Sequence, residues 1–293
     1  MMYEVLTYIN DRGEKVRLAV DSVYHCNVST DVDGISNVKN TVYKTSSMGQ
    51  NGESYNGQKI EAKDIDIHGA INTMDKERAY ELRRKLIKIL NPEIGGRLVY
   101  EFGEFKRVIR CRVSGEVKPY RKNLFVQFDI PLECLDPFWR EETEQKQDIA
   151  SWIPCLEFPV EIPDDEGMEF AYREPNVIVD VYNEGDVQTG MRIEFRATAT
   201  LHNPILLNVE TREFIKINAE MKAGDIVTVE TGYGKKGATL YRDGVTVDFY
   251  RKLDTDSTFM QLEVGDNIFR YDADDGVDML EVSIYHDNGY LGV

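Results

Sequence analysis

Apolar and polar residues alternate along much of this chain with a period of two. Ile109, Cys111 and Val113 are separated by arginines, and residues 124–130 repeat the pattern. Successive side chains of a strand point to opposite faces, so this alternation predicts half-buried antiparallel strands. Two shorter runs, 3–8 and 16–20, flank a turn-forming stretch around Gly13. The first half of the chain is therefore predicted to be rich in β-structure.

One segment of the first half has helical periodicity instead, and it predicts a helix over residues 74–91. Its apolar residues recur on one face: Ala79, Leu82, Leu86 and Ile89. Asn72 or Thr73 can cap its start, and Asn91, Pro92 and two following glycines end it. We expect this helix to cover one face of a sheet.

The rest of the helix surface is strongly basic and includes Arg83, Arg84 and Lys85. The simplest interpretation is a solvated face, as is usual for a helix that packs on a sheet. The alternative is that Arg83, Arg84 and Lys85 contact an acidic neighbouring subunit.

Residues 29–58 are rich in Ser, Asn, Gly and Asp and lack a clear apolar period. We expect a long loop or an irregular hairpin here. Segments of this length without a core of their own are often functional, and a partner often orders them. An arm that becomes ordered only in an assembly is the corresponding hypothesis.

The sequence of the second half of the chain predicts a sandwich of short strands. Candidate strands are 177–182, 191–198, 205–209, 214–217, 226–230, 239–241, 245–249, 259–264, 268–271 and 279–285. Turn signals separate them and no helical period intervenes, which is typical of a β-sandwich or jelly roll. The fold class is therefore mainly β, with one helix in the first half.

A polar stretch, residues 141–148, reads EETEQKQD and contains no core-forming residue. We interpret it as a linker between two domains, 1–148 and 149–293, with the second all-β segment beginning near Leu156. A chain of 293 residues is long enough for two hydrophobic cores.

The net charge of −17 at pH 7 argues against one class of binding partner, nucleic acids. Surfaces that grip nucleic acid are basic, so no specific nucleic-acid binding is expected, although DNA can pass beside an acidic wall. No apolar run approaches the roughly 18 residues of a membrane helix, so we expect no membrane contact. The N-terminal segment lacks the features of a secretion signal, which predicts synthesis and assembly in a host cytoplasm.

The motifs that carry chemistry are weak. Residues 232–237 match GxGxxG, but the residues that follow predict a hairpin and not the helix of a dinucleotide site. The acidic stretch from Asp272 to Asp278 lacks the ligand pattern of an EF-hand. The histidines are scattered, and no CxxC pair exists among the cysteines, which we expect to be reduced and mostly buried: Cys26, Cys111, Cys134 and Cys155.

We therefore predict no cofactor, no metal site and no catalytic residue. Carboxylate pairs suited to glycoside hydrolysis can form in the fold without any signature in sequence spacing, so an enzyme stays an alternative. Tyr233, Tyr241 and Tyr250 suggest a second alternative, a platform on which sugars stack. The aromatic content of strands also follows from β-propensity alone, and this explanation is the simpler one.

The first predicted domain ends in a distinctive stretch. Residues 133–140 contain Asp136, Pro137, Phe138 and Trp139 directly after a strand and a cysteine. A helix and a strand pair precede this stretch, and further turn motifs follow it in order: NxG at 183–185, AGD at 223–225 and GxN at 265–267. In this order and spacing the chain resembles the distal tail proteins of siphophages over nearly its whole length.

The resemblance implies a structural protein of the virion tail that forms a hexameric ring. The N-terminal domain would be a belt around a DNA channel, and the C-terminal domain a galectin-like or carbohydrate-module-like sandwich. Implied partners are further copies of the chain, the tail tube protein, the tail-associated hub protein and receptor-binding proteins. Phe138 and Trp139 are expected to be core anchors of the first domain. The alternatives are a carbohydrate-binding or cell-wall-targeting module and a cell-wall enzyme.

Overall fold

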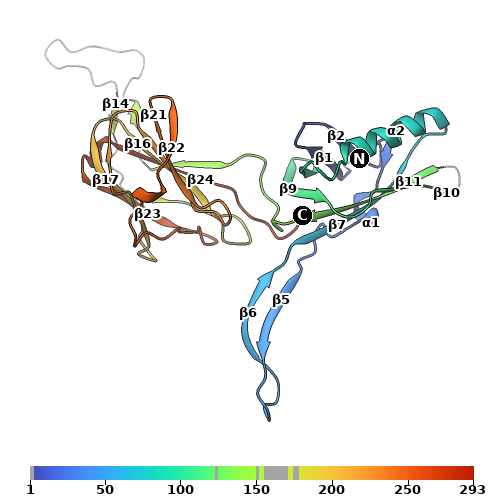
Figure 1. Cartoon of the computed structure of the whole chain (residues 1–293), viewed down its shortest axis with the longest axis horizontal. Coiled ribbons are helices and arrows are strands. Elements are labelled where there is room, and N and C mark those ends of the chain that lie inside the picture. The colour runs from blue at the N-terminus through green and yellow to red at the C-terminus, as the bar shows by residue number, and fades with distance from the viewer. Residues whose placement is uncertain (1–2, 123–124, 150–151, 155–170, 174–177) are drawn as a thin grey trace. The chain divides into compact units, whose positions relative to one another are not determined.

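The structure is a computed structural model that describes residues 3–122, 125–149, 152–154, 171–173 and 178–293. The chain forms two compact units, each treated by itself below (Figure 1). The first comprises Met1–Glu142 together with Gly289–Val293, and the second comprises Thr143–Asn288. The division thus lies before the predicted boundary at residue 148, and the last residues return to the first unit.

The first unit is built around a nine-stranded sheet, with a separate two-stranded sheet beside it. Its strands are β1 (Val5–Asn10), β2 (Lys15–Ala19), β3 (Tyr24–His25), β4 (Val32–Asp33), β5 (Asn40–Thr45), β6 (Ser54–Ile60), β7 (Lys63–Ile71), β8 (Gly96–Phe102), β9 (Phe105–Val113), β10 (Lys118–Lys122) and β11 (Phe125–Cys134). Its helices are α1 (Val28–Asp31) and α2 (Lys76–Ile89).

The large sheet closes on itself into a barrel. Strand β11 pairs with β7 along residues 126–134 and with β9 at Leu132 and Glu133, which joins the two ends of the order β11-β9-β8-β1-β2-β3-β7. Closure gives each of these strands a neighbour on both sides, although β9 meets β11 only at its C-terminal end. Only β2 and β3 pair in parallel; the other pairs of the barrel are antiparallel.

Strand β7 was missing from the prediction, although its sequence carries a regular alternation. Ile65, Ile67 and Ile71 are fully buried, while Asp64, Asp66 and His68 face solvent. The stretch adjoins the Ser- and Gly-rich segment, which masked its periodicity. The barrel cannot close without β7, so this omission concealed the architecture of the first unit.

Helix α2 confirms the predicted helix with shorter bounds. Its N-cap is Asp75, whose side chain accepts a hydrogen bond from the backbone N–H of Glu77 at 2.9 Å. The expected caps, Asn72 and Thr73, lie before the helix, and the N–H of Asn72 still donates to the Val23 carbonyl just before β3. Leu86 and Ile89 are buried against the barrel core.

The second unit is a sandwich of two sheets. Its elements are β12 (Gln145–Asp148), β13 (Trp152–Pro154), β14 (Ala171–Arg173), β15 (Ile178–Asp180), β16 (Met191–Ala197), β17 (Leu201–Asn208), β18 (Phe214–Lys216), β19 (Glu220–Met221), β20 (Ile226–Glu230), β21 (Gly237–Arg242), β22 (Val245–Asp248), η1 (Tyr250–Lys252), β23 (Ile268–Asp275), η2 (Val277–Met279) and β24 (Leu280–His286).

One sheet of the sandwich has the order β12-β24-β16-β20-β21-β22, and the other has β15-β23-β17-β18 with β19 beside β17. Inward residues of both sheets form a single core that includes Phe195, Val227, Leu206 and Phe269. Alternating burial, as in Met191–Ala197, is what two stacked antiparallel sheets require. The predicted mainly β fold, with a sandwich in the second half, is therefore confirmed.

Two predictions for this unit were wrong in detail. Residues 145–148, expected in a linker, form β12 and pair with residues 283–286 of β24. Residues 259–264 form no strand; Leu262 makes only an isolated bridge to Thr189. Leu156, where the second all-β segment was expected to begin, and Cys155 lie outside the described residues.

Candidate functional site

The hairpin of β5 and β6 projects away from the barrel of its unit (Figure 1). All six residues of β5 are exposed, and nothing between positions 36 and 62 belongs to the barrel core. The two strands pair only with each other, with a bulge between Tyr43 and Lys44. The segment predicted as a long loop or irregular hairpin is thus a two-stranded arm, preceded by the short α1 and β4.

The arm exposes apolar side chains that an isolated ribbon cannot bury. Val42, Tyr43 and Tyr55 are 46%, 50% and 64% exposed, and Met48 at its tip is fully exposed. The strand register places Val42, Lys44 and Tyr55 on one face. A lone two-stranded hairpin is at best marginally stable in water, so such a face gains stability when a partner covers it.

The base of the arm is fixed against the barrel. Gly34 has φ of +92°, and a Cβ atom there would lie 2.0 Å from the carbonyl oxygen of Asp64. Only glycine permits this approach of two backbone segments. The Lys39 ammonium lies 3.4 Å from the Asp64 carboxylate, and the N–H of Glu61 donates to the Lys39 carbonyl.

The basic face of α2 is the second candidate surface of this unit. Arg84 and Lys85 are exposed, and the guanidinium of the half-buried Arg83 lies 5.4 Å from the centre of the Tyr80 ring. Within the described part of the chain, none of Arg83, Arg84 and Lys85 forms an ion pair. Exposed Tyr80 and Ile87 lie on the same helix, so its outer face is both basic and partly apolar.

The stretch Asp136–Trp139 is structural. Trp139 is fully buried, as predicted, and its Nε1–H donates to the Ile35 carbonyl at 3.1 Å. Asp136 accepts hydrogen bonds from the Arg140 guanidinium, which leaves Pro137 and Phe138 half-buried at the surface. Phe138 is therefore not the core anchor that the sequence predicted.

Residues 289–293 form a strap that packs on the same unit, which sequence reasoning missed. Tyr290 and Trp139 exchange backbone hydrogen bonds of 2.8 and 2.9 Å. The buried Lys63 ammonium donates to the carbonyls of Ile35 and Leu291, and burial lowers the pKa of Lys63. The central carbon of the Arg107 guanidinium also lies 4.0 Å from the centre of the Tyr290 ring. No local pattern in the sequence predicts such a long-range return.

The remaining sequence candidates show no reactive geometry. Residues 231–236 connect two antiparallel strands, β20 and β21, which confirms the predicted turn. Asp274 is engaged by Lys216 and Asn203. Over the described residues, no group of three acidic, histidine or cysteine side chains could hold a metal ion. In the same part of the chain, no helix has the length and apolar character needed to cross a membrane.

The described cysteines are buried and free, as expected: Cys26, Cys111 and Cys134. Burial raises the pKa of Cys26 to about 12, and the hydrogen bond with Cys134 raises the pKa of Cys111. A thiol with a raised pKa is a poor nucleophile and a poor metal ligand. These residues therefore act as small apolar side chains.

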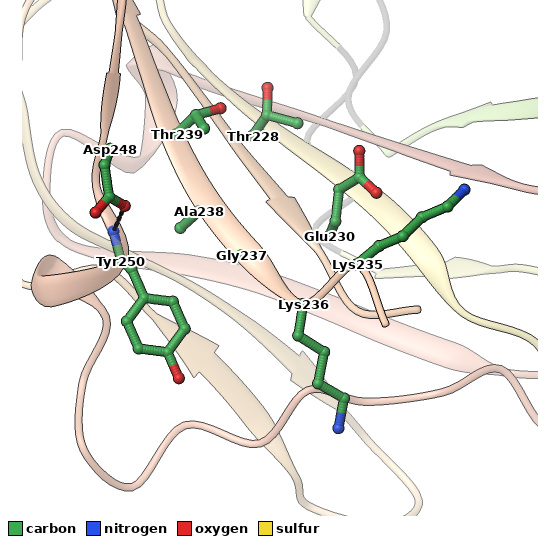
Figure 2. Close-up of a pocket in the computed structure, with 9 residues that line it drawn as sticks. All are labelled: Thr228, Glu230, Lys235, Lys236, Gly237, Ala238, Thr239, Asp248 and Tyr250. Atoms are coloured by element: carbon green, nitrogen blue, oxygen red, sulfur yellow. Dashed lines mark hydrogen bonds between the residues drawn. The ribbon is translucent and has the colours of Figure 1, made fainter. Parts of the chain in front are cut away.

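A shallow hollow of about 400 Å³ lies on the outer face of the second unit (Figure 2). It is lined by Thr228, Glu230, Lys235, Lys236, Gly237, Ala238, Thr239, Asp248 and Tyr250. Of the three tyrosines proposed for sugar stacking, Tyr250 lines the hollow. Tyr233 is connected to it through Lys236, whose ammonium lies 5.1 Å from the Tyr233 ring. Tyr241 does not line it.

Two protein-family models match this chain, one in each unit. Residues 25–134 match the family model described as the phage tail protein RIFT-related domain. Residues 184–290 match the model described as the siphovirus-type tail component, C-terminal domain. No curated protein sequence matches the chain.

Solved structures show the same fold at low sequence identity. The chain aligns with the Dit protein (gp 19.1) of SPP1, described as a paradigm of the hub adsorption apparatus in phages that infect Gram-positive bacteria, with a TM-score of 0.70 and 13% identity, over 98% of this chain and 100% of that one. Chains of the phage p2 baseplate in its activated conformation align with TM-scores of 0.56, with strontium, and 0.54, with calcium. Their identities are 10% and 12%, over 99% and 100% of both chains.

A barrel followed by a sandwich, each matched by a tail-protein model, defines a structural component of a phage tail. Within that class, the chain belongs to the siphophage distal tail protein family. It is thus a tail and baseplate protein, as the resemblance of its sequence predicted.

Proposed function

We propose that this protein forms a hexameric ring that joins the tail tube to the tail tip or baseplate. The observation that carries the proposal is the arm of β5 and β6, which exposes Val42, Tyr43 and Tyr55 and contributes nothing to the core of its own unit. An arm that docks on a neighbour makes a head-to-tail contact, and such contacts close into a ring when the rotation between copies is right.

The first unit would form the wall of the ring around a channel for DNA. The basic residues Arg83, Arg84 and Lys85 would contact an acidic surface of the adjacent copy, in keeping with the charge of −17 on the whole chain. The ring would bind the tail tube protein and the tail-associated hub protein, and the second unit would bind receptor-binding proteins or other baseplate parts. The role is one of scaffolding, without catalysis.

The assemblies to which the similar structures belong support this proposal. SPP1 Dit is described as part of a hub adsorption apparatus, and the phage p2 chains belong to a baseplate.

Light scattering combined with negative-stain electron microscopy tests the ring. We expect rings with a central hole and a mass near six chains of 33.7 kDa, about 202 kDa. A particle of two chains would instead indicate a reciprocal exchange of arms and would contradict the ring. A monomer that gains no mass with the tail tube and hub proteins added would also contradict it.

Two pairs of variants locate the contacts. Val42→Ser with Tyr55→Ser should shift the mass towards the monomer, because the apolar face of the arm is lost. Arg84→Glu with Lys85→Glu should weaken the ring, most strongly at low salt. The matched control is Arg251→Glu with Lys252→Glu, an exposed basic pair of the second unit. If the control weakens the ring as much as the helix variant, the basic face has no specific role.

A further inference from the structure

The outer face of the six-stranded sheet in the second unit divides into two halves with different charge pairing. On β12, β24 and β16 the charges satisfy one another. Arg192 pairs with Glu144 and Glu194, Tyr285 donates to Glu194, and Lys146 pairs with Asp148. The guanidinium of Arg192 lies 3.8 Å from the centre of the Tyr285 ring. This half is a closed network.

On β20, β21 and β22 the charged groups around the hollow do not pair with one another. Among the described residues, Glu230, Lys235 and Lys236 form no ion pair. Asp248 accepts one hydrogen bond, from the backbone N–H of Tyr250 at 3.0 Å, and its second carboxylate oxygen is free of described partners. The hydroxyls of Thr228 and Thr239, which face each other across the strands, point to the same side.

An aromatic group borders the hollow. The Tyr250 ring stacks on the Phe259 ring, with 6.0 Å between centres and 15° between planes. The Lys236 ammonium lies 5.5 Å from the Phe259 ring, so the lysine and both aromatic side chains are held together. Figure 2 shows Tyr250 and Asp248 on one side of Gly237 and Ala238, with Glu230 and Lys235 on the other.

Gly237 forms the open floor of the hollow. Its register partner is Glu230, and it shares the outward face with Thr239. A Cβ atom at this position would meet only the Lys235 carbonyl oxygen, at 3.7 Å, and the backbone has no positive φ. Neither packing nor conformation requires glycine here, yet any larger side chain would fill the hollow.

We propose that this hollow binds one saccharide unit. Sugars present a C–H face that stacks on an aromatic ring and hydroxyls that both donate and accept hydrogen bonds. Tyr250 offers the ring. Glu230 and Asp248 accept from hydroxyls, and Lys235 donates to them. The site is independent of the ring proposed above and adds a binding activity to a scaffolding protein.

The composition of the hollow disfavours other ligands. Two carboxylates oppose a phosphate, and two ammonium groups oppose a metal cation. A peptide that adds as a strand pairs with a sheet edge, which on this side is β22, so it would lie beside the hollow and not in it. A neutral ligand with many hydroxyls can donate hydrogen bonds to the carboxylates and accept them from the ammonium groups.

Saturation-transfer NMR on the full chain tests the proposal, with glucose, galactose, N-acetylglucosamine and rhamnose as probes. We expect transfer to at least one sugar, with a Kd on the order of 1 mM. Asp248→Asn keeps the acceptor for the Tyr250 N–H but removes the charge, and should weaken binding roughly tenfold. An array of immobilised oligosaccharides, probed with the same protein, distinguishes a sugar within a polymer from the free sugar.

Gly237→Leu should abolish transfer without lowering the melting temperature, because the added side chain enters open space. Thr246→Leu, an exposed change on β22 outside the hollow, is the matched control and should bind as the unmodified chain does. The proposal is overturned if none of the four sugars receives saturation, or if Gly237→Leu and Asp248→Asn both bind normally. Light scattering on the same variants reports ring formation separately.

Discussion

The barrel and the arm of the first unit are both made of antiparallel strands with alternating side chains, yet they treat apolar residues in opposite ways. In the barrel, Ile65, Ile67 and Leu132 are almost completely buried. In the arm, Val42 and Tyr55 are about half exposed or more. Every barrel strand has a neighbour on both sides, whereas β5 and β6 have only each other.

The stability of the first unit therefore comes from the barrel. Burial of one large apolar side chain contributes about 1.5–3 kcal/mol, so the barrel holds the folding free energy. The apolar residues of the arm contribute little within one chain and are available for binding energy between chains. Substitutions in the two regions should therefore separate folding from assembly.

The largest effect on folding is expected from Trp139→Ala. The change removes a fully buried ring, its hydrogen bond to the Ile35 carbonyl and its edge contact with Tyr100 at 6.4 Å. We expect a loss of about 3–5 kcal/mol in the free energy of unfolding of the first unit. Denaturant unfolding followed by backbone circular dichroism measures this loss without relying on the fluorescence of the removed tryptophan. A loss below about 1 kcal/mol, which is typical of surface substitutions, would contradict the assignment of Trp139 to the core.

An intermediate effect is expected at the junction of barrel and arm. Gly34→Ala places a Cβ atom against the Asp64 carbonyl at a positive φ, which should cost about 2–3 kcal/mol. Gly49→Ala is the matched control, since Gly49 has φ of +86° with no atom near its missing Cβ. It should cost about 1 kcal/mol. Equal thermal shifts for both variants would show that the close contact is unimportant.

A small, pH-dependent effect is expected at the seam that closes the barrel. His68 on β7 pairs with Asp129 on β11 at 2.7 Å, and this hydrogen bond raises the pKa of His68. A raised pKa means that the stabilisation is complete below the unfolded value of roughly 6.5 and is lost as pH rises through the folded value. Both side chains are partly exposed, so the effect should stay below about 1 kcal/mol.

Melting temperatures at about pH 5.5 and about pH 8 measure the seam, with Asp129→Asn as the comparison. The unmodified protein should lose more stability between the two pH values than the variant does. A variant with the same or a larger loss would show that the pair does not stabilise the closure.

The smallest effect on folding, and the largest on assembly, belongs to the arm. The pair Val42→Ser and Tyr55→Ser should change the unfolding free energy by no more than about 0.5 kcal/mol, because both residues are already exposed. If this variant unfolds as easily as Trp139→Ala, the arm is part of the fold and the contrast between the two regions fails.

Much of the local structure could be predicted because it depends on near neighbours in the sequence. The period of two in Ile109–Val113 and the helical period of Leu82, Leu86 and Ile89 each predicted the right element. The order of turn motifs and the stretch Asp136–Trp139 predicted the family. Burial of Trp139 followed from its size and position after a strand.

Other features could not be predicted because they depend on contacts between distant segments. Gln145–Asp148 is polar on its own and becomes a strand only because β24 offers an edge. The hollow of the second unit combines residues of three strands and η1, so spacing along the chain did not indicate it. Tyr250 and Tyr233 were singled out as aromatic residues and Gly237 only as the end of a GxGxxG match, whereas Asp248 carried no signal.

By itself, then, the sequence determined the type of most elements, the mainly β class, the two-part organisation and the family. Side-chain periodicity is a local property, and each of these conclusions follows from it or from short motifs. Three features depend instead on long-range contacts: β7 and β11 close a barrel, residues 289–293 return to the first unit, and the arm stays outside the core. Each of these depends on which distant backbone groups find one another, because a strand can pair with any free edge that satisfies its hydrogen bonds.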